Sequence, residues 1–311
     1  MPQENPARTS LLDRPYLLLS AASLFWAINI VLGRYIVGTV PPIMLAQIRW
    51  TGAGLILLPF VLHHLRRDWP AIRAHLGVMI ALSLSGVTLY NTLAYYALQY
   101  TQAINGLLIQ STGPLIIGLI SYLYFRDRLT AGQLAGILLS LIGVLTIISG
   151  GSLETLLGLD FNQGDLLFLL ALVIYSAYLA AMRLRPPIHM LSFLAFTIIA
   201  GAILQIPATV VEYALGHRID PTPQAFLVMA YVATFPSMIA YLFFNRGVDL
   251  SGANRAGPFL HLIPVFGSVI AFFFLGERPG LHHFVGYALI LGGIFAAQRY
   301  ARKSPSPSRG G

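Results

Sequence analysis

The segment 257–267, GPFLHLIPVFG, places a single histidine among two prolines and two glycines inside a long apolar run. Proline removes a backbone donor and glycine weakens a helix, so the segment predicts a bent or loosened helix. An imidazole in apolar surroundings needs a hydrogen-bonding partner or water. We therefore interpret His261 either as a group that faces substrate or water in a cavity, or as a neutral ring bonded to a neighbouring helix.

Further polar and aromatic side chains interrupt other apolar runs, and polar groups at such depth usually face a bundle interior or a water-filled cavity. Amides can hydrogen-bond a polar ligand, and aromatic rings can stack on a flat molecule or hold a cation. For Asn29 and Asn91, hydrogen bonding between helices explains the residues as well as cavity lining does. The candidate substrate-binding residues are Trp26, Asn29, Tyr90, Asn91, Tyr95, Gln110, Ser111, Tyr175, Tyr178, Tyr241 and His261.

The sequence contains no motif for enzymatic chemistry. The histidine pairs at 63–64 and 282–283 lack the glutamate of a His-Glu-x-x-His zinc site, and there is no phosphate-binding loop. The acids Asp127, Asp165 and Glu277 lie at the ends of apolar runs, so no pair of carboxylates falls inside one. The sequence therefore predicts no catalytic residue, no metal site and no cofactor.

The composition indicates a membrane protein. Of 311 residues, 57% are hydrophobic and 10% charged, and the mean hydropathy is +0.74, whereas soluble proteins carry about 25% charged residues. A helix needs about 20 apolar residues to cross a bilayer. The predicted fold class is an all-α polytopic membrane protein whose ten transmembrane helices lie near 16–37, 43–62, 76–97, 103–124, 131–149, 165–182, 188–211, 224–245, 256–275 and 281–298.

The basic residues set the predicted orientation. With ten helices both termini lie on one side, and fifteen of the nineteen Lys and Arg residues fall on that side, against three on the other. Positive charge collects in cytoplasmic connections, so both termini are predicted to be cytoplasmic, in the inner (plasma) membrane of a bacterial cell. Membrane topology thus explains the excess of basic residues, and a nucleic-acid partner is not needed to explain it. The expected partners are a small-molecule substrate and membrane lipid, and the chain is expected to be monomeric.

An internal repeat divides the chain in two. A shift of 150 residues aligns the stretch from Ser111 with the stretch from His261 without a gap, and Asp127–Arg128 then meets Glu277–Arg278. Two five-helix units are predicted, at 1–150 and 151–311, and the second ends in a disordered C-terminal tail. Because five is odd, the second unit enters the membrane from the opposite face, as in the inverted repeats of transporters.

Inverted repeats place the substrate site in a central cavity near the membrane midplane. The shift sets His261 opposite Ser111, so both are expected at that depth. It also aligns Pro114 with Pro264. Broken backbone is tolerated there only where protein or cavity water satisfies the freed carbonyls. The two prolines are therefore predicted to bend their helices as a pair of alternating-access hinges.

Two stretches carry a family resemblance: FWAINIVLGRYIVGTVPPIMLAQIRW at 25–50 and FLGERPGLHHFVGYALILGG at 274–293. Through them the chain resembles the drug/metabolite transporter superfamily, EamA type, over nearly its whole length, and within it the YddG-type amino acid exporters. FRDRLT at 125–130 departs from the Gly-Glu step that the family often has there. The resemblance implies ten helices, cytoplasmic termini and a central cavity lined mainly by helices other than the fifth and tenth.

Arg49 is the one basic residue well inside an apolar run. Its side chain can extend to the outer surface or pair with an acid such as Glu277, and both are structural roles. It can also bind a substrate carboxylate. The family that the chain resembles has arginine here widely, across different substrates, which favours a structural role.

A cavity with aromatic walls and amides suits amino acids, and it suits flat cations through cation–π contact. We predict a secondary transporter that exports small metabolites, chiefly amino acids (aromatic and related) and also flat cationic compounds, by alternating access. The alternatives are a lipid-linked sugar flippase of the same superfamily and an intramembrane enzyme. Proton coupling, exchange and uniport remain open as the driving force.

Overall fold

The computed structural model describes residues 11–126, 130–158, 161–251 and 257–301. Within these ranges every regular element is helical. Seven helical segments are long and apolar enough to cross a membrane, or eight if the bent pair Ala103–Gln110 and Gly113–Phe125 is one span. Two further apolar helices, Phe259–Leu275 and Leu281–Ala296, are shorter. The all-helical fold of a multi-pass membrane protein is thus confirmed, and the number of ten spans remains a prediction.

The helices follow the apolar runs of the sequence. The repeat step at Asp127–Arg128 and most of the polar tail lie outside the described residues. In chain order the elements are η1 (Leu11–Asp13), α1 (Pro15–Tyr35), α2 (Pro42–Ala74), α3 (Leu76–Ser83), η2 (Leu84–Leu89), α4 (Tyr90–Ala97), α5 (Ala103–Gln110), α6 (Gly113–Phe125), α7 (Ala131–Ile148), α8 (Leu153–Gly158), α9 (Gln163–Ala181), η3 (Met182–Leu184), α10 (Met190–Ala214), α11 (Pro223–Thr234), η4 (Phe235–Ile239), α12 (Ala240–Ser251), η5 (Gly257–His261), α14 (Leu262–Leu275) and α15 (Leu281–Ala301).

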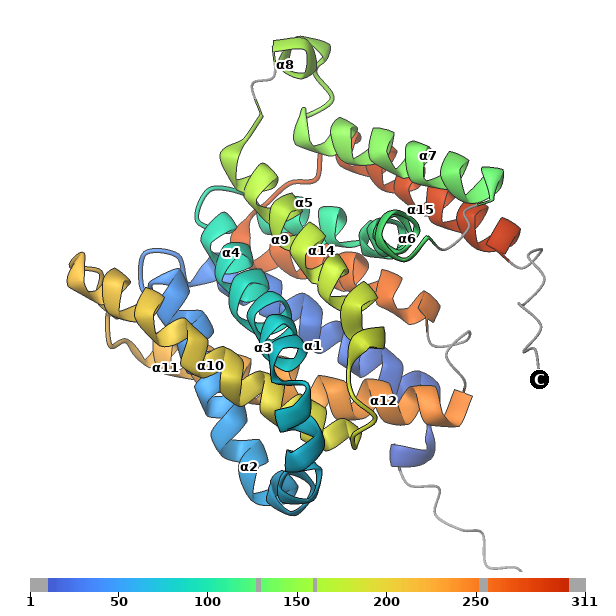
Figure 1. Ribbon diagram of the computed structural model, residues 1–311. Helices are drawn as coiled ribbons and strands as arrows, with labels where there is room; N and C mark the ends of the chain where they lie inside the picture. Colours follow the sequence, from blue (N-terminus) through green and yellow to red (C-terminus); the bar gives the residue numbers. More distant parts are fainter. Residues whose placement is uncertain (1–10, 127–129, 159–160, 252–256, 302–311) are drawn as a thin grey trace, which may run out of the picture.

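Helices that are distant in the sequence form the main packing pairs. α2 packs against α10, α7 against α15, and α1 against both α12 and α14. In Figure 1, α7 and α15 lie side by side at the upper right, and α8 stands apart above them. Each of these pairs joins the first half of the chain to the second, so the packed interior is shared between the two predicted repeats.

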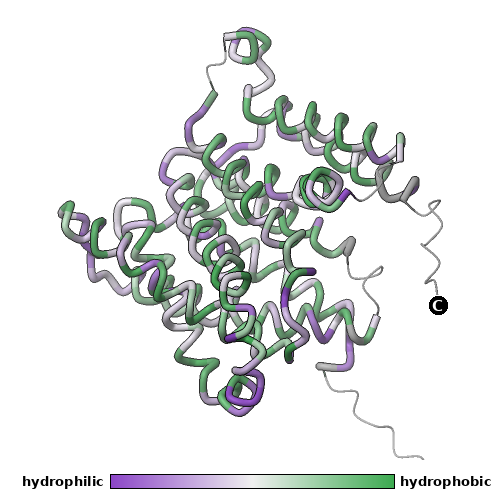
Figure 2. The backbone as a smooth tube through the Cα atoms, in the orientation of Figure 1, coloured by the Kyte–Doolittle hydropathy of each residue, from purple (hydrophilic) through white to green (hydrophobic). Residues whose placement is uncertain are grey.

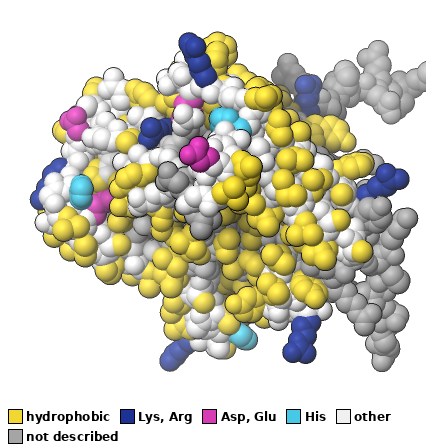
Figure 3. Space-filling view, turned by 90° about the horizontal axis from the view of Figure 1, so that it is seen from above, with side chains coloured by type: hydrophobic (Ala, Val, Ile, Leu, Met, Phe, Trp, Pro, Cys, Tyr) yellow, Lys and Arg dark blue, Asp and Glu magenta, His cyan; other side chains and the backbone are white. Residues whose placement is uncertain are grey.

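Large apolar side chains face outward on several helices. Phe273 and Phe274 on α14 are 75% and 77% exposed, and Tyr124 on α6 is 80% exposed. Hydrophobic residues dominate along the helices in Figure 2 and form broad patches on the face shown in Figure 3. Exposed apolar surface of this extent marks a site of contact with a membrane or another protein, and on spanning helices it fits contact with lipid.

Glycines allow α7 and α15 to approach closely. A Cβ atom at Gly143 would lie 2.6 Å from the carbonyl oxygen of Gly286, and a Cβ at Gly286 would lie 2.8 Å from the carbonyl oxygen of Gly143. Small residues are enriched at such interfaces because lipid tails give apolar helices no hydrophobic reason to associate, and close packing then supplies the attraction.

Carboxylates connect α2 and α10 at both ends of the pair. Glu212, near the end of α10, accepts hydrogen bonds from the backbone N–H groups of Ile43 (3.1 Å) and Met44 (2.8 Å) at the start of α2. Asp68, near the end of α2, accepts from the backbone N–H of His189 (2.8 Å), just before α10. The first N–H groups of a helix lack partners within it, and negative charge is favoured there. Each helix therefore supplies the acid that caps the other.

We expect Gly143→Ala to lower the thermal stability of the purified protein in detergent, because the new methyl group meets backbone of α15 that cannot move without separating the helices. Overpacking of this kind costs about 1–3 kcal/mol. The matched control is Gly118→Ala in α6, where a Cβ would meet no atom within 4 Å. It should leave the unfolding midpoint unchanged or raise it slightly. Equal midpoints for the two variants would contradict the packing argument.

Candidate functional site

A polar cluster forms where α2, α4 and the η4 turn meet, and Arg49 is its centre. Arg49 lies about 10 Å along α2 and is 6% exposed. Its Nε donates to Ser237 Oγ (2.7 Å), and its Nη1 donates to Asn91 Oδ1 (2.9 Å) and Tyr95 Oη (3.1 Å). The guanidinium also lies 4.6 Å from the ring centroid of Trp50. All of these neighbours are uncharged.

Tyr95 extends the cluster to the first helix. Its hydroxyl accepts from Arg49 and donates to Asn29 Oδ1 at 2.7 Å. Asn91 uses its Nδ2 to donate to the backbone oxygen of Val87 at 2.9 Å. Three predicted site residues, Asn29, Asn91 and Tyr95, are therefore joined to Arg49 in one hydrogen-bonded group, which with Ser237 we call the central polar cluster.

Two π-helical turns lie beside the central polar cluster. Ser237 is inside η4, and Asn91 follows η2 by two positions and bonds back into it. The 150-residue shift makes η2 overlap η4, so the same irregularity occurs at repeat-related positions. Such turns are rare and frequently mark functional sites, because they redirect side chains and free backbone groups.

The predicted tyrosines form an aromatic cluster next to Arg49. The rings of Tyr90 and Tyr175 stack with centroids 4.3 Å apart, and Tyr178 lies 5.5 Å from Tyr175. Tyr241 lies close to both Tyr175 and Tyr178. Tyr90 directly precedes Asn91, whose Oδ1 accepts from Arg49. These rings come from α4, α9 and α12, so both halves of the chain supply them.

Trp26 connects the aromatic cluster to the central polar cluster. Its indole Nε1 donates to the backbone oxygen of Pro236 at 3.0 Å, directly before Ser237. Its ring meets that of Tyr241 edge-on, with centroids 5.5 Å apart. The aromatic cluster thus comprises Trp26, Tyr90, Tyr175, Tyr178 and Tyr241.

Three predicted site residues have no hydrogen bond or ring contact with either cluster in the described part of the chain. Ser111 Oγ donates to the backbone oxygen of Leu108 at 2.6 Å within its own segment. Gln110 has a buried Oε1 without a hydrogen-bond partner among the described residues. His261 is half-buried, and its backbone oxygen accepts from the Tyr287 hydroxyl at 3.0 Å. A part in substrate binding stays a prediction for all three.

The predicted hinge prolines lie near irregular points of their helices. α5 and α6 meet at 45°, and Pro114 is the second residue of α6. The 3₁₀ turn η5 continues directly into α14, and Pro264 is the third residue of α14. Both prolines stand where a missing N–H costs no hydrogen bond, because the first turn of a helix leaves its N–H groups free. Their action as hinges stays a prediction.

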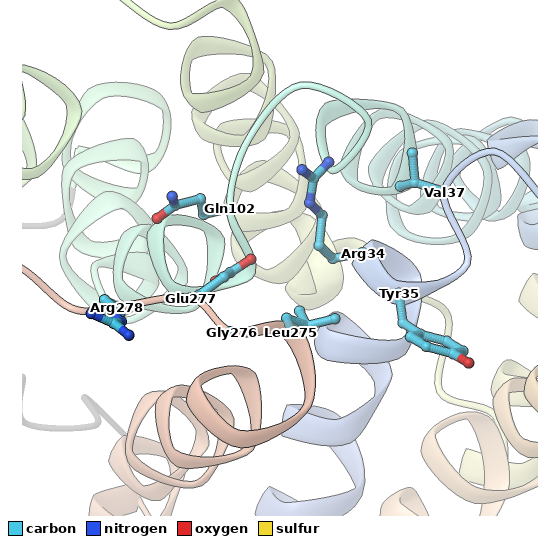
Figure 4. Close-up of a pocket in the computed structure, with 8 residues that line it drawn as sticks. All are labelled: Arg34, Tyr35, Val37, Gln102, Leu275, Gly276, Glu277 and Arg278. Atoms are coloured by element: carbon cyan, nitrogen blue, oxygen red, sulfur yellow. The ribbon is translucent and has the colours of Figure 1, made fainter.

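Two adjoining pockets, of about 720 and 550 Å³, open at the molecular end that carries the α1–α2 connection. Both are lined by Arg34, Gln102 and Arg278, and neither is lined by a predicted substrate-binding residue. Figure 4 shows the first pocket, with Glu277 on the α14–α15 connection and Gln102 directly before α5 among the residues that line it. The central polar and aromatic clusters therefore lie apart from the lining of these two pockets, packed against one another.

Glu277 caps α5 and does not pair with Arg49. Its Oε1 accepts from the backbone N–H of Ala103 (2.8 Å) and its Oε2 from that of Ile104 (3.0 Å), and the residue is 9% exposed. One structural explanation for Arg49, an ion pair with Glu277, is thus wrong. The other, extension to the surface, does not fit a residue that is 6% exposed.

A second buried acid lies beside the same pockets. Asp165, near the start of α9, accepts hydrogen bonds from Thr101 Oγ1 and from Asn105 Nδ2 (3.1 and 3.0 Å) and is 1% exposed. The Asn105 Oδ1 in turn bonds His283 Nε2 at 2.9 Å. These hydrogen bonds connect α5, α9 and α15. The polar side chains at this end of the molecule therefore hold helices together.

Sequence reasoning did not find Ser237 and did not place Arg49 in the site. The proline directly before Ser237 signals an interrupted helix, since proline lacks the backbone donor. A hydroxyl beside such an interruption is free to bond a side chain from another helix. The lone arginine in α2 was visible from the sequence, and its uncharged surroundings were not.

Comparison with known proteins finds relatives along almost the whole chain. The sequence model of the EamA-like transporter family matches residues 14–149 and 162–297. The uncharacterized transporter YyaM of Bacillus subtilis (strain 168) is 27% identical over 92% of this chain and 94% of its own length. The S-adenosylmethionine/S-adenosylhomocysteine transporter of Chlamydia trachomatis serovar L2 is 26% identical over 89% of this chain and 88% of its own length.

A solved crystal structure shares the fold. It superimposes with a TM-score of 0.62 at 22% sequence identity, and the match covers 94% of this chain and 99% of that chain.

We expect Glu277→Ala to destabilise the protein by about 1–3 kcal/mol, because it leaves two buried N–H donors at the start of α5 without partners. The measurement is the thermal unfolding midpoint in detergent. Glu154→Ala, in the exposed helix α8, is the matched control because it removes the same side chain from a solvated position. Equal unfolding midpoints for Glu277→Ala and Glu154→Ala would show that the Glu277 cap does not stabilise the fold.

Proposed function

The chain belongs to the EamA-like transporter family, and on this premise we propose that it is a secondary transporter that exports small metabolites, chiefly aromatic and related amino acids. The family and the names of the relatives indicate a transporter and not an enzyme. The proposed cargo includes flat cationic compounds, and the proposed mechanism is alternating access between the two repeats.

The aromatic cluster carries the proposal. Trp26, Tyr90, Tyr175, Tyr178 and Tyr241 come from α1, α4, α9 and α12, so both halves of the chain contribute rings to one place. Aromatic pairs contribute about 0.5–1.5 kcal/mol beyond the area that they bury. When the halves move relative to one another, these rings exchange contacts with each other for contacts with a flat cargo.

The name of one relative fits this kind of cargo. The Chlamydia protein is named for S-adenosylmethionine and S-adenosylhomocysteine. Both molecules combine an amino acid end with a flat purine base, which is the combination that rings and hydrogen-bonding groups recognise. Aromatic amino acids present the same two features on a smaller scale.

The proposed topology is ten spans in two inverted repeats, 1–150 and 151–311, in the bacterial inner membrane with both termini cytoplasmic. The paired irregularities at η2 and η4 and the reciprocal caps of α2 and α10 support related halves. The two shorter apolar helices near the C-terminus would supply the ninth and tenth spans. At about 1.5 Å per residue, 17 residues reach about 26 Å, within the range of short spans.

We expect Tyr175→Ala to raise the KM for export of L-phenylalanine or L-tryptophan about three- to tenfold, because it removes the ring stacked on Tyr90. The assay is counterflow of labelled amino acid in proteoliposomes, normalised to inserted protein. Tyr124→Ala is the matched control, since Tyr124 is 80% exposed at the end of α6. If both variants transport like the parent, the aromatic cluster does not bind cargo.

The topology can be read from single cysteines, because the chain contains none. In intact cells, a membrane-impermeant maleimide should label a Ser152→Cys variant, which lies between the repeats. It should label a Ser304→Cys variant only after the membrane is permeabilised. Labelling of Ser304→Cys from outside would overturn cytoplasmic termini, and protection of Ser152→Cys would overturn the inverted arrangement.

A further inference from the structure

Arg49 carries a positive charge into the interior without an acid beside it. It is 6% exposed, and no carboxylate of the described residues lies within ion-pair distance of its guanidinium. Burial of a charge is unfavourable unless hydrogen bonds or a counter-ion compensate. Loss of the proton offers no relief, because arginine stays protonated in proteins.

The buried acids of the described chain are engaged elsewhere. Glu212 binds the first N–H groups of α2, and Glu277 binds those of α5. Asp165 is held by Thr101 and Asn105. Each of these carboxylates already has partners at a helix end, so none is available to neutralise Arg49.

One nitrogen of the guanidinium has no hydrogen-bond partner among the described residues. Nε and Nη1 are used by Ser237, Asn91 and Tyr95, whereas Nη2 donates to no described residue. Arginine presents its five N–H donors in a planar fork that matches the two oxygens of a carboxylate. The N–H groups of Nη2 can donate to one carboxylate oxygen, and the second oxygen can replace Asn91 Oδ1 or Tyr95 Oη as a partner of Nη1.

The neighbouring rings lie beside the guanidinium. The ring centroid of Tyr95 lies 6.0 Å from the guanidinium carbon. Tyr90 directly precedes Asn91, which accepts from Arg49, and its ring stacks on that of Tyr175. A molecule with a carboxylate at one end and a flat group at the other can therefore contact Arg49 and the aromatic cluster at once.

We infer that Arg49 binds the carboxylate of the transported molecule, an assignment that rests on the proposed function. Asn91, Tyr95 and Ser237 are positioning residues that hold the guanidinium while the site is empty. The cargo's carboxylate loses water and gains a buried counter-charge, and the loaded site then holds no unpaired guanidinium. Flat cations that lack a carboxylate are repelled by Arg49, so the inference narrows the proposed cargo to carboxylates.

The test compares three probes of similar size. Unlabelled L-phenylalanine, L-phenylalaninamide and 3-phenylpropionate compete with labelled L-phenylalanine for uptake into proteoliposomes. The same three probes are added to the purified full-length protein, and the ligand-induced shift of its unfolding midpoint reports binding without transport. The amide keeps the ring and the amine and replaces only the carboxylate, whereas 3-phenylpropionate keeps the ring and the carboxylate and lacks the amine.

In the parent protein, L-phenylalanine should compete for uptake and shift the unfolding midpoint at concentrations at least about tenfold below those that the amide needs. This is the difference that the loss of a charge-assisted hydrogen bond predicts. Arg49→Gln should reduce this preference to less than about threefold, and Arg49→Lys should retain part of it. The control is Arg34→Gln, whose guanidinium bonds the backbone oxygens of Leu98 and Gln99 away from the cluster. It should keep the full preference.

Equal action of L-phenylalanine and its amide on the parent protein would overturn the inference and leave amino acid transport standing, and this holds even if Arg49→Gln fails to fold. A full preference in folded Arg49→Gln would overturn it too. If 3-phenylpropionate shifts the unfolding midpoint in an Arg49-dependent way and L-phenylalanine does not, Arg49 binds a carboxylate but the cargo is not an amino acid. If no probe shifts the midpoint or competes for uptake, both proposals are wrong.

Discussion

The guanidinium of Arg49 can be buried only where several oxygen atoms converge on it, and this requirement ties the centre of the molecule together. Ser237, Asn91 and Tyr95 supply those oxygens from two elements, and Asn29 holds Tyr95 from a third. The planar guanidinium donates hydrogen bonds only in fixed directions. These bonds therefore restrict how α1, α2, α4 and η4 can cross. The aromatic cluster is positioned by the same crossing through Trp26 and Tyr90.

The same rule, that buried polar groups need partners, acts with the opposite charge at the helix ends. Three carboxylates each cap the start of a helix that belongs to the other half of the chain. They are those of Glu212, Asp68 and Glu277. The hydrogen bonds of Glu212 and Glu277 are largely buried, where water competes little for backbone groups, so these two caps hold the halves together where α2 and α5 begin. With the acids fixed at the ends, the centre retains an uncompensated positive charge. This separation of charges is the reason that we propose Arg49 as the partner of a carboxylate on the cargo.

The sequence was sufficient for the class of fold and for part of the site. Apolar runs gave the helices, and Asn29, Asn91 and Tyr95 do meet, because polar groups in such runs turn toward one another and away from lipid. The contacts of Arg49 could not be read, since they depend on a π-helical turn that brings Ser237 into reach and on the use of Glu277 as a cap. Both are products of tertiary packing. Periodicity shows which helices exist, and it does not show which of several acids a buried arginine will meet.

If the central polar cluster is the proposed binding site, cargo must replace contacts that its neutral groups already make with one another. The hydroxyl of Tyr95 and the amide of Asn91 contact Arg49 in the arrangement seen here, and the stacked tyrosines contact one another. A ligand therefore gains only the difference between its own contacts and those it replaces, and a neutral hydrogen-bonding group gains little over Asn91. A carboxylate gains more, because charge-assisted hydrogen bonds are roughly twice as strong as neutral ones. On the proposed assignment, a carboxylate is selected because the protein supplies Arg49 with neutral partners and with no negative charge, so a neutral ligand has no advantage over the groups that it replaces.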